Sequence, residues 1–236
     1  MTSYSASSLI DSTNEFPEAV IFDMDGLLLD TEKLSAQSFA AVCAEWELPA
    51  MPQLLEALTG LAPAAQHGVM AGHLPDSIVV EDFDAAWKAA FLGLLEEGVP
   101  LKPAAAALAG GLAKMGMPLG VATSTPQAKA ERMLIEAGLH PWLKVIIGGD
   151  RIRCGKPAPD IYLAVAAALG KAPGGCLALE DSENGVRAAH AAGMTVIQIP
   201  DLQTPSAALL ELGHPVLPDL ASVAHRYGWA EACGLA

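Results

Sequence analysis

The sequence predicts an α/β protein in which helices cover a parallel sheet and a helical block is inserted after the first strand. From about residue 104 to 199, short apolar, β-prone segments alternate with helical patterns, which is the order that βαβ units produce. Residues 33–97 show helical apolar spacing and no convincing strand. With 236 residues, the chain is long enough for a large core and a smaller inserted domain.

The first predicted strand is residues 19–23, and the chain that follows it is helical to about Glu97. Apolar spacing marks three helices in that block, separated by prolines and glycines: Leu34–Trp46, Gln53–Leu58 and Asp82–Leu95. We therefore assign residues 17–32 and 98–236 to an α/β core. Residues 33–97 are assigned to a helical domain inserted into it.

After Pro103 each predicted helix leads into a strand. The pairs are helix 104–116 with strand 118–123, helix 126–138 with 144–147, helix 158–170 with 175–180, and helix 184–192 with 194–199. Right-handed crossovers and a reversal beside the first strand predict a Rossmann-like sheet of order 3-2-1-4-5. Ligands bind such sheets at the carboxyl ends of the strands, beside the reversal. After Pro200 we expect one or two short helices.

The composition limits the partners and the location of the protein. A net charge of −14, a pI near 4.7 and the lack of a basic stripe argue against nucleic acid as a partner. No apolar run reaches the ~18 residues that span a bilayer, so we expect no membrane association. The Ser-rich segment 1–14 lacks the pattern of a secretory signal, and we interpret it as a loose arm. Four scattered cysteines favour a reduced, cytoplasmic protein, which we expect to be a monomer or a weak homodimer.

The run from Val20 to Glu32 carries the strongest indication of function. Asp23 and Asp25 stand two residues apart at the end of the first predicted strand, so alternation places both carboxylates on one face. Gly26 then lets the backbone turn. Two adjacent carboxylates repel each other unless a cation or a proton relieves them, which suits a nucleophile beside an acid/base and Mg²⁺. The plain alternative is that both aspartates cap the next turn.

Three further segments place reactive side chains at or near strand ends. Thr123 and Ser124 end the second predicted strand, and Glu180 and Asp181 end the fourth. Lys156 lies between a glycine and two prolines, which stiffen and aim its loop. These segments therefore converge on one edge of the sheet. Each also has an ordinary interpretation: helix capping for the hydroxyls and acids, and a solvated loop for the lysine.

Together, these segments resemble the four motifs of the haloacid dehalogenase superfamily, in the branch of its phosphatases and β-phosphoglucomutases. Val20–Glu32 resembles the first motif, Val121–Ser124 the second, Cys154–Asp160 the third and Leu177–Gly185 the fourth. The resemblance spans roughly residues 19 to 199. It implies a Mg²⁺-dependent phosphomonoester hydrolase of a small phosphorylated metabolite, which works through an aspartyl-phosphate. The inserted helical domain would be a cap that closes over the site.

The resemblance also implies a role for each matching residue. Asp23 would be the nucleophile, and Asp25 the acid for the leaving alcohol and then the base for water. Mg²⁺ would be held by the Asp23 side chain, the Asp25 main-chain oxygen, Asp181, and Glu180 directly or through water. The phosphoryl oxygens would be bound by five groups: the N–H groups of Met24, Asp25 and Ser124, the Thr123 hydroxyl and the Lys156 ammonium.

Other members of the superfamily fit less well. Dehalogenases and phosphonate hydrolases lack the second acid, which is present here as Asp25. β-Phosphoglucomutase has a histidine at the position of Ser35 and an arginine just after the cap glycine, whereas Gly60 is followed here by Leu61, Ala62 and Pro63. A phosphatase is therefore preferred, and a sugar phosphomutase is the alternative. A non-catalytic binding protein on this scaffold is a third and weaker possibility, since all the motif residues are present.

Overall fold

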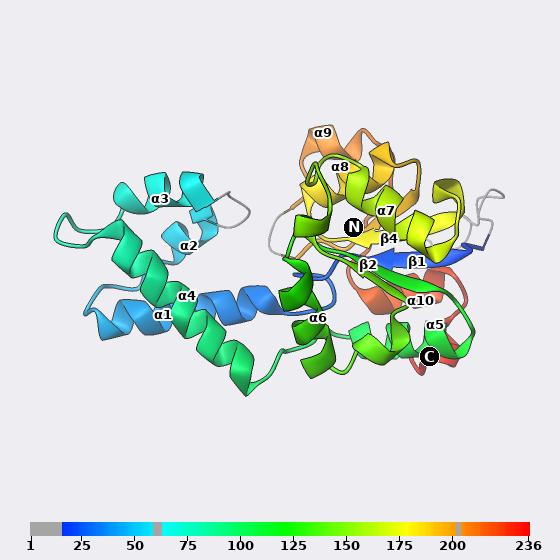
Figure 1. The fold of residues 1–236 in the computed structure, drawn as a ribbon, viewed down its shortest axis with the longest axis horizontal. Coiled ribbons are helices and arrows are strands. Elements are labelled where there is room, and N and C mark those ends of the chain that lie inside the picture. The colour runs from blue at the N-terminus through cyan, green and yellow to red at the C-terminus, as the bar shows by residue number, and fades with distance from the viewer. Residues whose placement is uncertain (1–15, 59–62, 202–203) are drawn as a thin grey trace, which may run out of the picture.

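The computed structural model describes residues 16–58, 63–201 and 204–236, as a sheet with helices on both faces and a group of four helices beside it (Figure 1). The strands are Ala19–Phe22 (β1), Leu119–Ala122 (β2), Val145–Ile147 (β3), Cys176–Glu180 (β4) and Thr195–Gln198 (β5). They are all parallel, in the order β3-β2-β1-β4-β5. The predicted Rossmann-like fold and strand order are confirmed.

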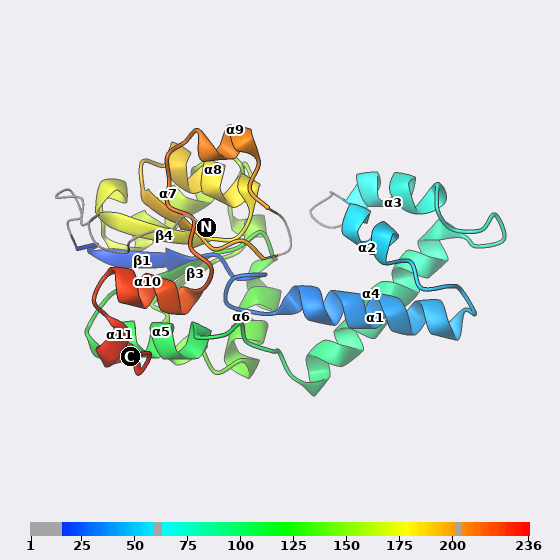
Figure 2. The same cartoon turned by 180° about the vertical axis from the view of Figure 1, so that it is seen from behind.

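Helices cover both faces of the sheet (Figures 1 and 2). One layer contains Ala105–Lys114 (α5), Gln127–Glu136 (α6), Leu220–Arg226 (α10) and Ala230–Cys233 (α11). The other contains Asp160–Leu169 (α7), Glu183–Ala191 (α8) and Ala207–Leu210 (α9). Three short 3-10 turns complete the connections: His140–Trp142, Gly149–Arg151 and Pro173–Gly175.

The central strand β1 shows how the sheet builds two cores. Val20 and Phe22 belong to the apolar cluster under α5 and α6, whereas Ala19 and Ile21 belong to the cluster under α7 and α8. All four side chains are fully buried. A continuous apolar strand is what a parallel sheet covered on both faces requires, and the first polar side chain after it falls at the carboxyl edge.

The second group of helices comprises Thr31–Glu45 (α1), Pro52–Leu58 (α2), Pro63–Ala71 (α3) and Val80–Glu97 (α4). It has a core of its own, in which the ring of Phe83 packs edge-on against Phe39 and Trp46, with ring centres 5.6 Å apart in both pairs. The helix α3 was not singled out by the sequence pattern.

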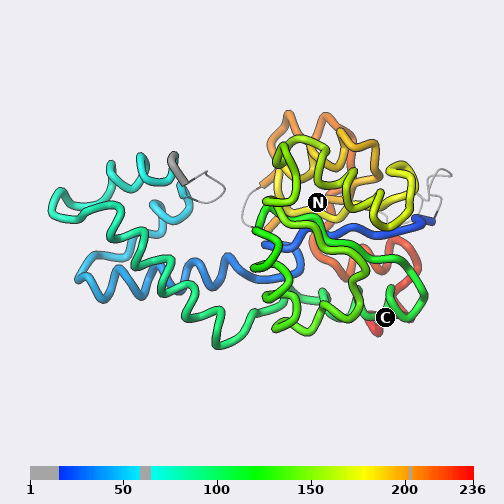
Figure 3. The backbone as a smooth tube through the Cα atoms, viewed as in Figure 1, coloured from blue at the N-terminus to red at the C-terminus, as the bar shows by residue number. Residues whose placement is uncertain are grey.

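Two connections join this group to the sheet, and both can be followed in Figure 3. They are hydrogen-bonded to each other: Asp30 N–H donates to Pro100 O at 2.8 Å and Lys102 N–H donates to Leu28 O at 2.9 Å. An antiparallel bridge pairs Leu29 with Leu101. The chain therefore leaves the sheet and returns to it through one short two-stranded link.

The region after Pro200 contains three short helices among the described residues, so the prediction of one or two was too low. The reason is local capping: Ser206 Oγ accepts from Leu209 N–H to start α9, and Asp219 accepts from Ser222 N–H to start α10. Two segments of the sequence analysis lie outside the described residues: the predicted arm at residues 1–14, and Gly60 with Leu61 and Ala62. No helix in the described part of the chain combines the length and the apolar character needed to cross a bilayer.

Candidate active site

Asp23 directly follows β1, and the sheet holds its backbone in place. Its N–H donates to Leu179 O at 2.9 Å, and Phe22 pairs in register with the same residue of β4. Asp23 therefore lies at the carboxyl edge beside the acidic pair that ends β4. Oxygens of Asp23, Glu180 and Asp181 all lie within 4.8 Å of one another.

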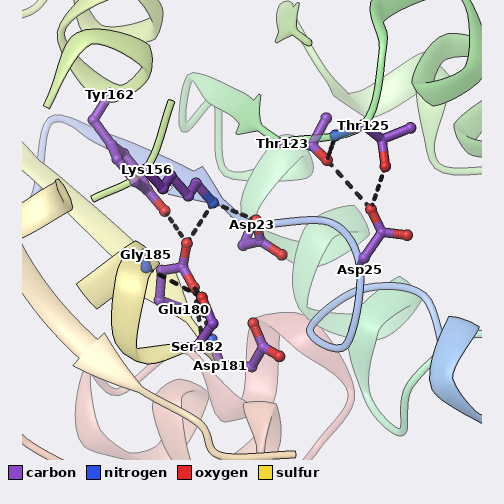
Figure 4. A network of polar contacts seen from close by, with 10 residues as sticks. All are labelled: Asp23, Asp25, Thr123, Thr125, Lys156, Tyr162, Glu180, Asp181, Ser182 and Gly185. Atoms are coloured by element: carbon purple, nitrogen blue, oxygen red, sulfur yellow. Dashed lines mark hydrogen bonds and ion pairs between the residues drawn. The ribbon is translucent and has the colours of Figure 1, made fainter. Parts of the chain in front are cut away.

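Lys156 reaches this carboxylate group from the loop before α7 (Figure 4). Its Nζ donates hydrogen bonds to Asp23 Oδ1 and to Glu180 Oε1. The lysine side chain is only 6% exposed, so solvent screens these ion pairs little. One buried ammonium thus links the end of β1 to the end of β4.

Glu180 is fully buried, and protein groups saturate its carboxylate. Tyr162 on α7 donates a 2.7 Å hydrogen bond to Oε1, the oxygen that also accepts from Lys156. The other oxygen accepts from Ser182 Oγ at 3.0 Å and from the N–H groups of Asp181 and Ser182. In this arrangement Glu180 anchors Lys156.

Ser182 is also the N-cap of α8, because its Oγ accepts from Gly185 N–H at 3.1 Å. A Cβ at position 185 would overlap the Glu180 carboxylate, so this turn needs a glycine. Ser182 therefore both holds the turn after β4 and starts α8.

Burial dominates the electrostatics of this group. It raises the pKa of Asp23 to about 8, and the nearby charge of Glu180 adds to the shift, although Lys156 opposes it. The pKa of Asp181 is also well above its usual value, because of burial and then the charges of Asp23 and Glu180. Burial alone would lower the pKa of Lys156, but the two carboxylates outweigh it and raise that pKa. Without a cation, Asp23 and Asp181 therefore tend to hold protons, and a bound cation would favour their ionised forms.

Asp25 belongs to a second group of polar contacts, on the side of Asp23 away from Glu180 (Figure 4). Its Oδ2 accepts from Thr125 Oγ1 at 2.8 Å and from Thr123 Oγ1 at 3.3 Å. Thr123 is almost fully buried, and its Oγ1 also accepts from Thr125 N–H at 3.0 Å. Two hydroxyl groups at the end of β2 thus hold the carboxyl group of Asp25 in one orientation.

The turn after Asp23 brings backbone N–H groups to the same edge. Gly26 has φ +83°, a backbone conformation that favours glycine. A Cβ there would also collide with the Asp181 carboxylate, so the backbone angle and the close contact each require glycine. Within the described part of the chain, no acceptor is recorded for the N–H groups of Met24, Asp25 or Ser124. These are the three amides that the resemblance assigns to the phosphoryl group.

A cavity of about 390 Å³ lies between the four-helix group and α6. Its lining residues are Ser35, Gln66, Asp84, Trp87, Lys88, Phe91, Leu92 and Lys129. Asp84 is nearly buried and accepts from Lys88 Nζ at 2.6 Å and from His67 Nε2 at 3.0 Å. Trp87 Nε1 donates to Ser35 O at 3.1 Å, which fixes the indole as one wall.

The structure therefore sorts the predicted residues into two neighbouring groups. Asp23, Lys156, Glu180 and Asp181 lie together, and Asp25 lies with Thr123 beside them. Met24 contributes only its backbone, because its side chain is fully buried in the core. Ser124 is exposed next to this second group.

Several functional candidates were missed by the sequence reasoning. Tyr162 was the one hydroxyl on an otherwise apolar face of α7, a signal that was available. Thr125 was not among the predicted site residues, although its hydroxyl donates to Asp25. Asp84 and Lys129 had no signal, since they meet at the cavity only through tertiary packing.

The carboxylate group fits a hard divalent cation. Its donors are oxygens, which Mg²⁺ prefers, and their mutual distances are short enough for a shared ion. Burial raises the pKa of Asp23 and of Asp181, and neighbouring carboxylates add to both shifts, so a bound cation would favour their ionised forms. Asp201 Oδ2, which also faces Gly26, is buried without a hydrogen-bond partner among the described residues.

The fold and the site together define an α/β protein with a lysine-bound carboxylate group at the switch point of its sheet. The family model described as haloacid dehalogenase-like hydrolase matches residues 17–193. The chain belongs to this family.

Curated relatives and solved structures agree with this assignment. The chain is 34% identical to "Protein CbbY, plasmid" of Cupriavidus necator, over 92% of this chain and 95% of that protein. It is 33% identical to "Phosphorylated carbohydrates phosphatase" of Thermotoga maritima, over 75% and 82%. A crystal structure of a putative β-phosphoglucomutase from Thermotoga maritima superposes with a TM-score of 0.73 at 30% identity, covering 85% of this chain and 94% of that one.

Proposed function

We propose that the protein is a Mg²⁺-dependent phosphatase that hydrolyses the phosphomonoester of a small metabolite through an aspartyl-phosphate on Asp23. The observation that carries this proposal is the buried pairing of Asp23 with Lys156 beside Asp181. The family assignment and the similarity to a protein named as a phosphatase of phosphorylated carbohydrates support the same reaction class.

In this proposal, one Asp23 oxygen attacks phosphorus, and the alcohol leaves as the P–O bond breaks. Lys156 donates to Asp23 Oδ1, which leaves Oδ2 as the attacking oxygen. The lysine would therefore orient the nucleophile and offset the charge of the incoming phosphoryl group. Glu180 holds the lysine through the bond to its Oε1.

Asp25 would give a proton to the leaving oxygen and later take one from the attacking water, which releases phosphate and restores Asp23. Thr125 and Thr123 hold its carboxyl group at the edge of the site. The phosphoryl oxygens would meet the Thr123 hydroxyl and the N–H groups of Met24, Asp25 and Ser124. Such preoriented donors contribute about 3 kcal/mol each to transition-state stabilisation.

The ion would be held by the Asp23 side chain, the Asp25 main-chain oxygen and Asp181, with Glu180 as a direct or water-mediated ligand. When bound, Mg²⁺ supplies positive charge that stabilises the phosphoryl oxygens. Because Glu180 already accepts bonds from Lys156, Tyr162 and Ser182, its contact would be the most indirect of the four.

The four-helix group is proposed as a cap domain, residues 33–97, which closes on a core of residues 17–32 and 98–236. The two-stranded link at Leu29 and Leu101 would serve as its hinge. The 390 Å³ cavity between the cap and α6 has the size for a small metabolite rather than a polymer, and it is lined by residues other than the proposed catalytic ones, so it would hold the part of the substrate away from the phosphoryl group. The charged side chains of Asp84, Lys88 and Lys129 in its lining would determine substrate specificity.

Ser35 favours hydrolysis over a phosphomutase reaction. It lies in the wall of the cavity, where the resemblance places a histidine in the mutase. A serine hydroxyl cannot exchange protons near neutral pH as an imidazole does. The mutase remains the second candidate, and formation of glucose 6-phosphate from β-glucose 1-phosphate without net phosphate release would favour it.

A cytoplasmic location is proposed because each of the four cysteines is a free thiol. The decisive experiment on activity uses Asp23→Asn, which keeps the shape of the side chain. Release of phosphate from p-nitrophenyl phosphate with Mg²⁺ should fall to background in this variant. Full retained activity of Asp23→Asn would contradict the mechanism. Separately, a screen of phosphorylated metabolites on the wild type would identify the substrate class.

A further inference from the structure

Asp201 lies in the loop after β5, outside all four motifs, and yet faces the carboxylate group. A Cβ placed on Gly26 would touch Asp181 Oδ2 and would lie 3.5 Å from Asp201 Oδ2, so both oxygens border the same small space. Asp201 Oδ2 is buried and has no hydrogen-bond partner within the described ranges. A buried carboxylate oxygen without a donor is costly, which indicates that its donor is a group the protein is built to bind.

The other oxygen of Asp201 is held by Lys102. Its Nζ donates to Asp201 Oδ1 at 2.6 Å, and both side chains are largely buried. The lysine stands in the hinge link, where its own N–H donates to Leu28 O at 2.9 Å. Asp30, the other carboxylate near the ammonium, is farther away at 3.8 Å. The lysine thus orients Asp201 so that Oδ1 accepts the bond from Lys102 and Oδ2 points toward Gly26.

The charge of Asp201 is only partly offset by this pairing. Burial raises the pKa of Glu32, and the next largest contribution is repulsion from Asp201, followed by Asp25. Lys102 acts in the opposite sense and is outweighed. The space around Gly26 is thus bordered by two carboxylates, Asp181 and Asp201.

We propose that Asp201 is an outer carboxylate of the cation site, and that Lys102 is its positioning residue. The proposal rests on the Mg²⁺ site inferred above. Asp201 is not one of the three carboxylates whose oxygens lie within 4.8 Å of one another. Its Oδ2 would therefore accept a hydrogen bond from the hydration shell of the ion, which Mg²⁺ usually retains in part. Outer groups of this kind orient the primary ligands and tune metal affinity.

The test is a calorimetric titration of the full-length protein with MgCl₂, without any phosphate ester present. Asp201→Asn should weaken Mg²⁺ binding about 10–100-fold, the range for loss of such an outer group. Asp30→Asn is the matched control, since it removes the same charge near Lys102 without facing Gly26. The Asp30 carboxylate is partly exposed and lies farther from the ammonium than Asp201 does, so its loss should change the affinity by no more than about twofold. Wild-type affinity in Asp201→Asn would overturn the proposal.

Lys102 is tested by Lys102→Met and by the double variant. Lys102→Met should weaken Mg²⁺ binding, Lys102→Arg should restore most of it, and the double variant should bind no more weakly than Asp201→Asn alone. Additive losses would exclude Lys102 as a positioning residue. Melting curves in EDTA check folding, and if Asp201→Asn does not fold, Lys102→Met alone decides. This readout is independent of catalysis, so a failure here leaves the Asp23 mechanism standing, and the Asp23→Asn assay judges that separately.

Discussion

The Tyr162 hydroxyl donates a 2.7 Å hydrogen bond to Glu180 Oε1, and both residues are fully buried. The same oxygen accepts from Lys156, whose Nζ lies 5.2 Å from the centre of the tyrosine ring. A tyrosine of α7 that lies outside the four motifs therefore supports the lysine that faces Asp23. The arrangement makes Glu180 an anchor with its own supporting residue.

Tyr162→Phe should destabilise the protein by about 1.5–3 kcal/mol, the range for a hydrogen bond to a charged group. The ring and its packing against Lys156 remain, so the loss reports the hydroxyl alone. Urea unfolding measures it. Tyr227→Phe is the matched control, because Tyr227 stacks on Trp229 and no hydrogen bond of its hydroxyl is recorded among the described residues. Equal losses in both variants would contradict the anchoring role of Tyr162.

Asp181→Asn should make the metal-free protein more stable at neutral pH. The pKa of Asp181 is raised, so its ionised form is disfavoured in the folded state. The stability it contributes is present below the ordinary carboxyl pKa and is lost as pH rises through the raised value. A neutral amide removes this cost, and a gain of 1 kcal/mol would raise Tm by about 2–4 °C in a chain of this size.

The same variant should lose the rise in Tm that Mg²⁺ gives to the wild type. Scanning calorimetry with EDTA and with MgCl₂ measures both effects. Asp76→Asn, in an exposed loop of the four-helix group, is the control and should change neither. An Asp181→Asn protein that is still stabilised by Mg²⁺ would argue against Asp181 as a ligand.

Thr125→Val should impair the proposed acid/base step without affecting substrate binding. It removes the 2.8 Å bond that orients Asp25. We expect kcat to fall about 10-fold at unchanged KM, which is only part of the roughly 10²–10⁴-fold that acid–base catalysis contributes, because Thr123 still donates to Asp25. The loss should be greater for an alkyl phosphate than for p-nitrophenyl phosphate, because nitrophenolate leaves without a proton. Thr125→Ser keeps the hydroxyl and should restore the rate; equal losses for both leaving groups would separate Thr125 from acid catalysis.

Asp84 should stabilise the four-helix group at neutral pH and lose this effect in acid. Burial alone would raise the pKa of Asp84, but the hydrogen bonds from Lys88 and His67 outweigh it and hold that pKa below its usual value. A depressed pKa contributes stability above the ordinary carboxyl value, and this is lost as pH falls through the folded pKa. The difference between wild type and Asp84→Asn should therefore be about 1 kcal/mol at pH 7, as for partly exposed pairs, and shrink below pH 4. Chemical unfolding across this range checks it, and a difference that is independent of pH would contradict the assignment.

The strands and their parallel arrangement were predictable from short-range patterns, and the strand order followed from assuming the Rossmann-like reversal beside the first strand. Continuous apolar strands such as Ala19–Phe22 alternate with amphipathic helices, and parallel connections have one preferred hand. Helices without strong periodicity, such as α3 and the short ones after Pro200, depend on caps and local packing and were not resolved by pattern alone.

Residue types and spacing determined by themselves that Asp23, Thr123, Lys156 and Asp181 would stand at one edge of the sheet, since each follows a strand or precedes a helix. Tertiary structure alone decided which of them touch. Lys156 donates to Asp23 and Glu180, and Tyr162 and Ser182 supply further donors to Glu180. Asp201 and Lys102, 99 positions apart, met beside Gly26 because the sheet and the hinge link bring distant segments together. Contacts of that range depend on the packing of whole elements, which local sequence patterns do not encode.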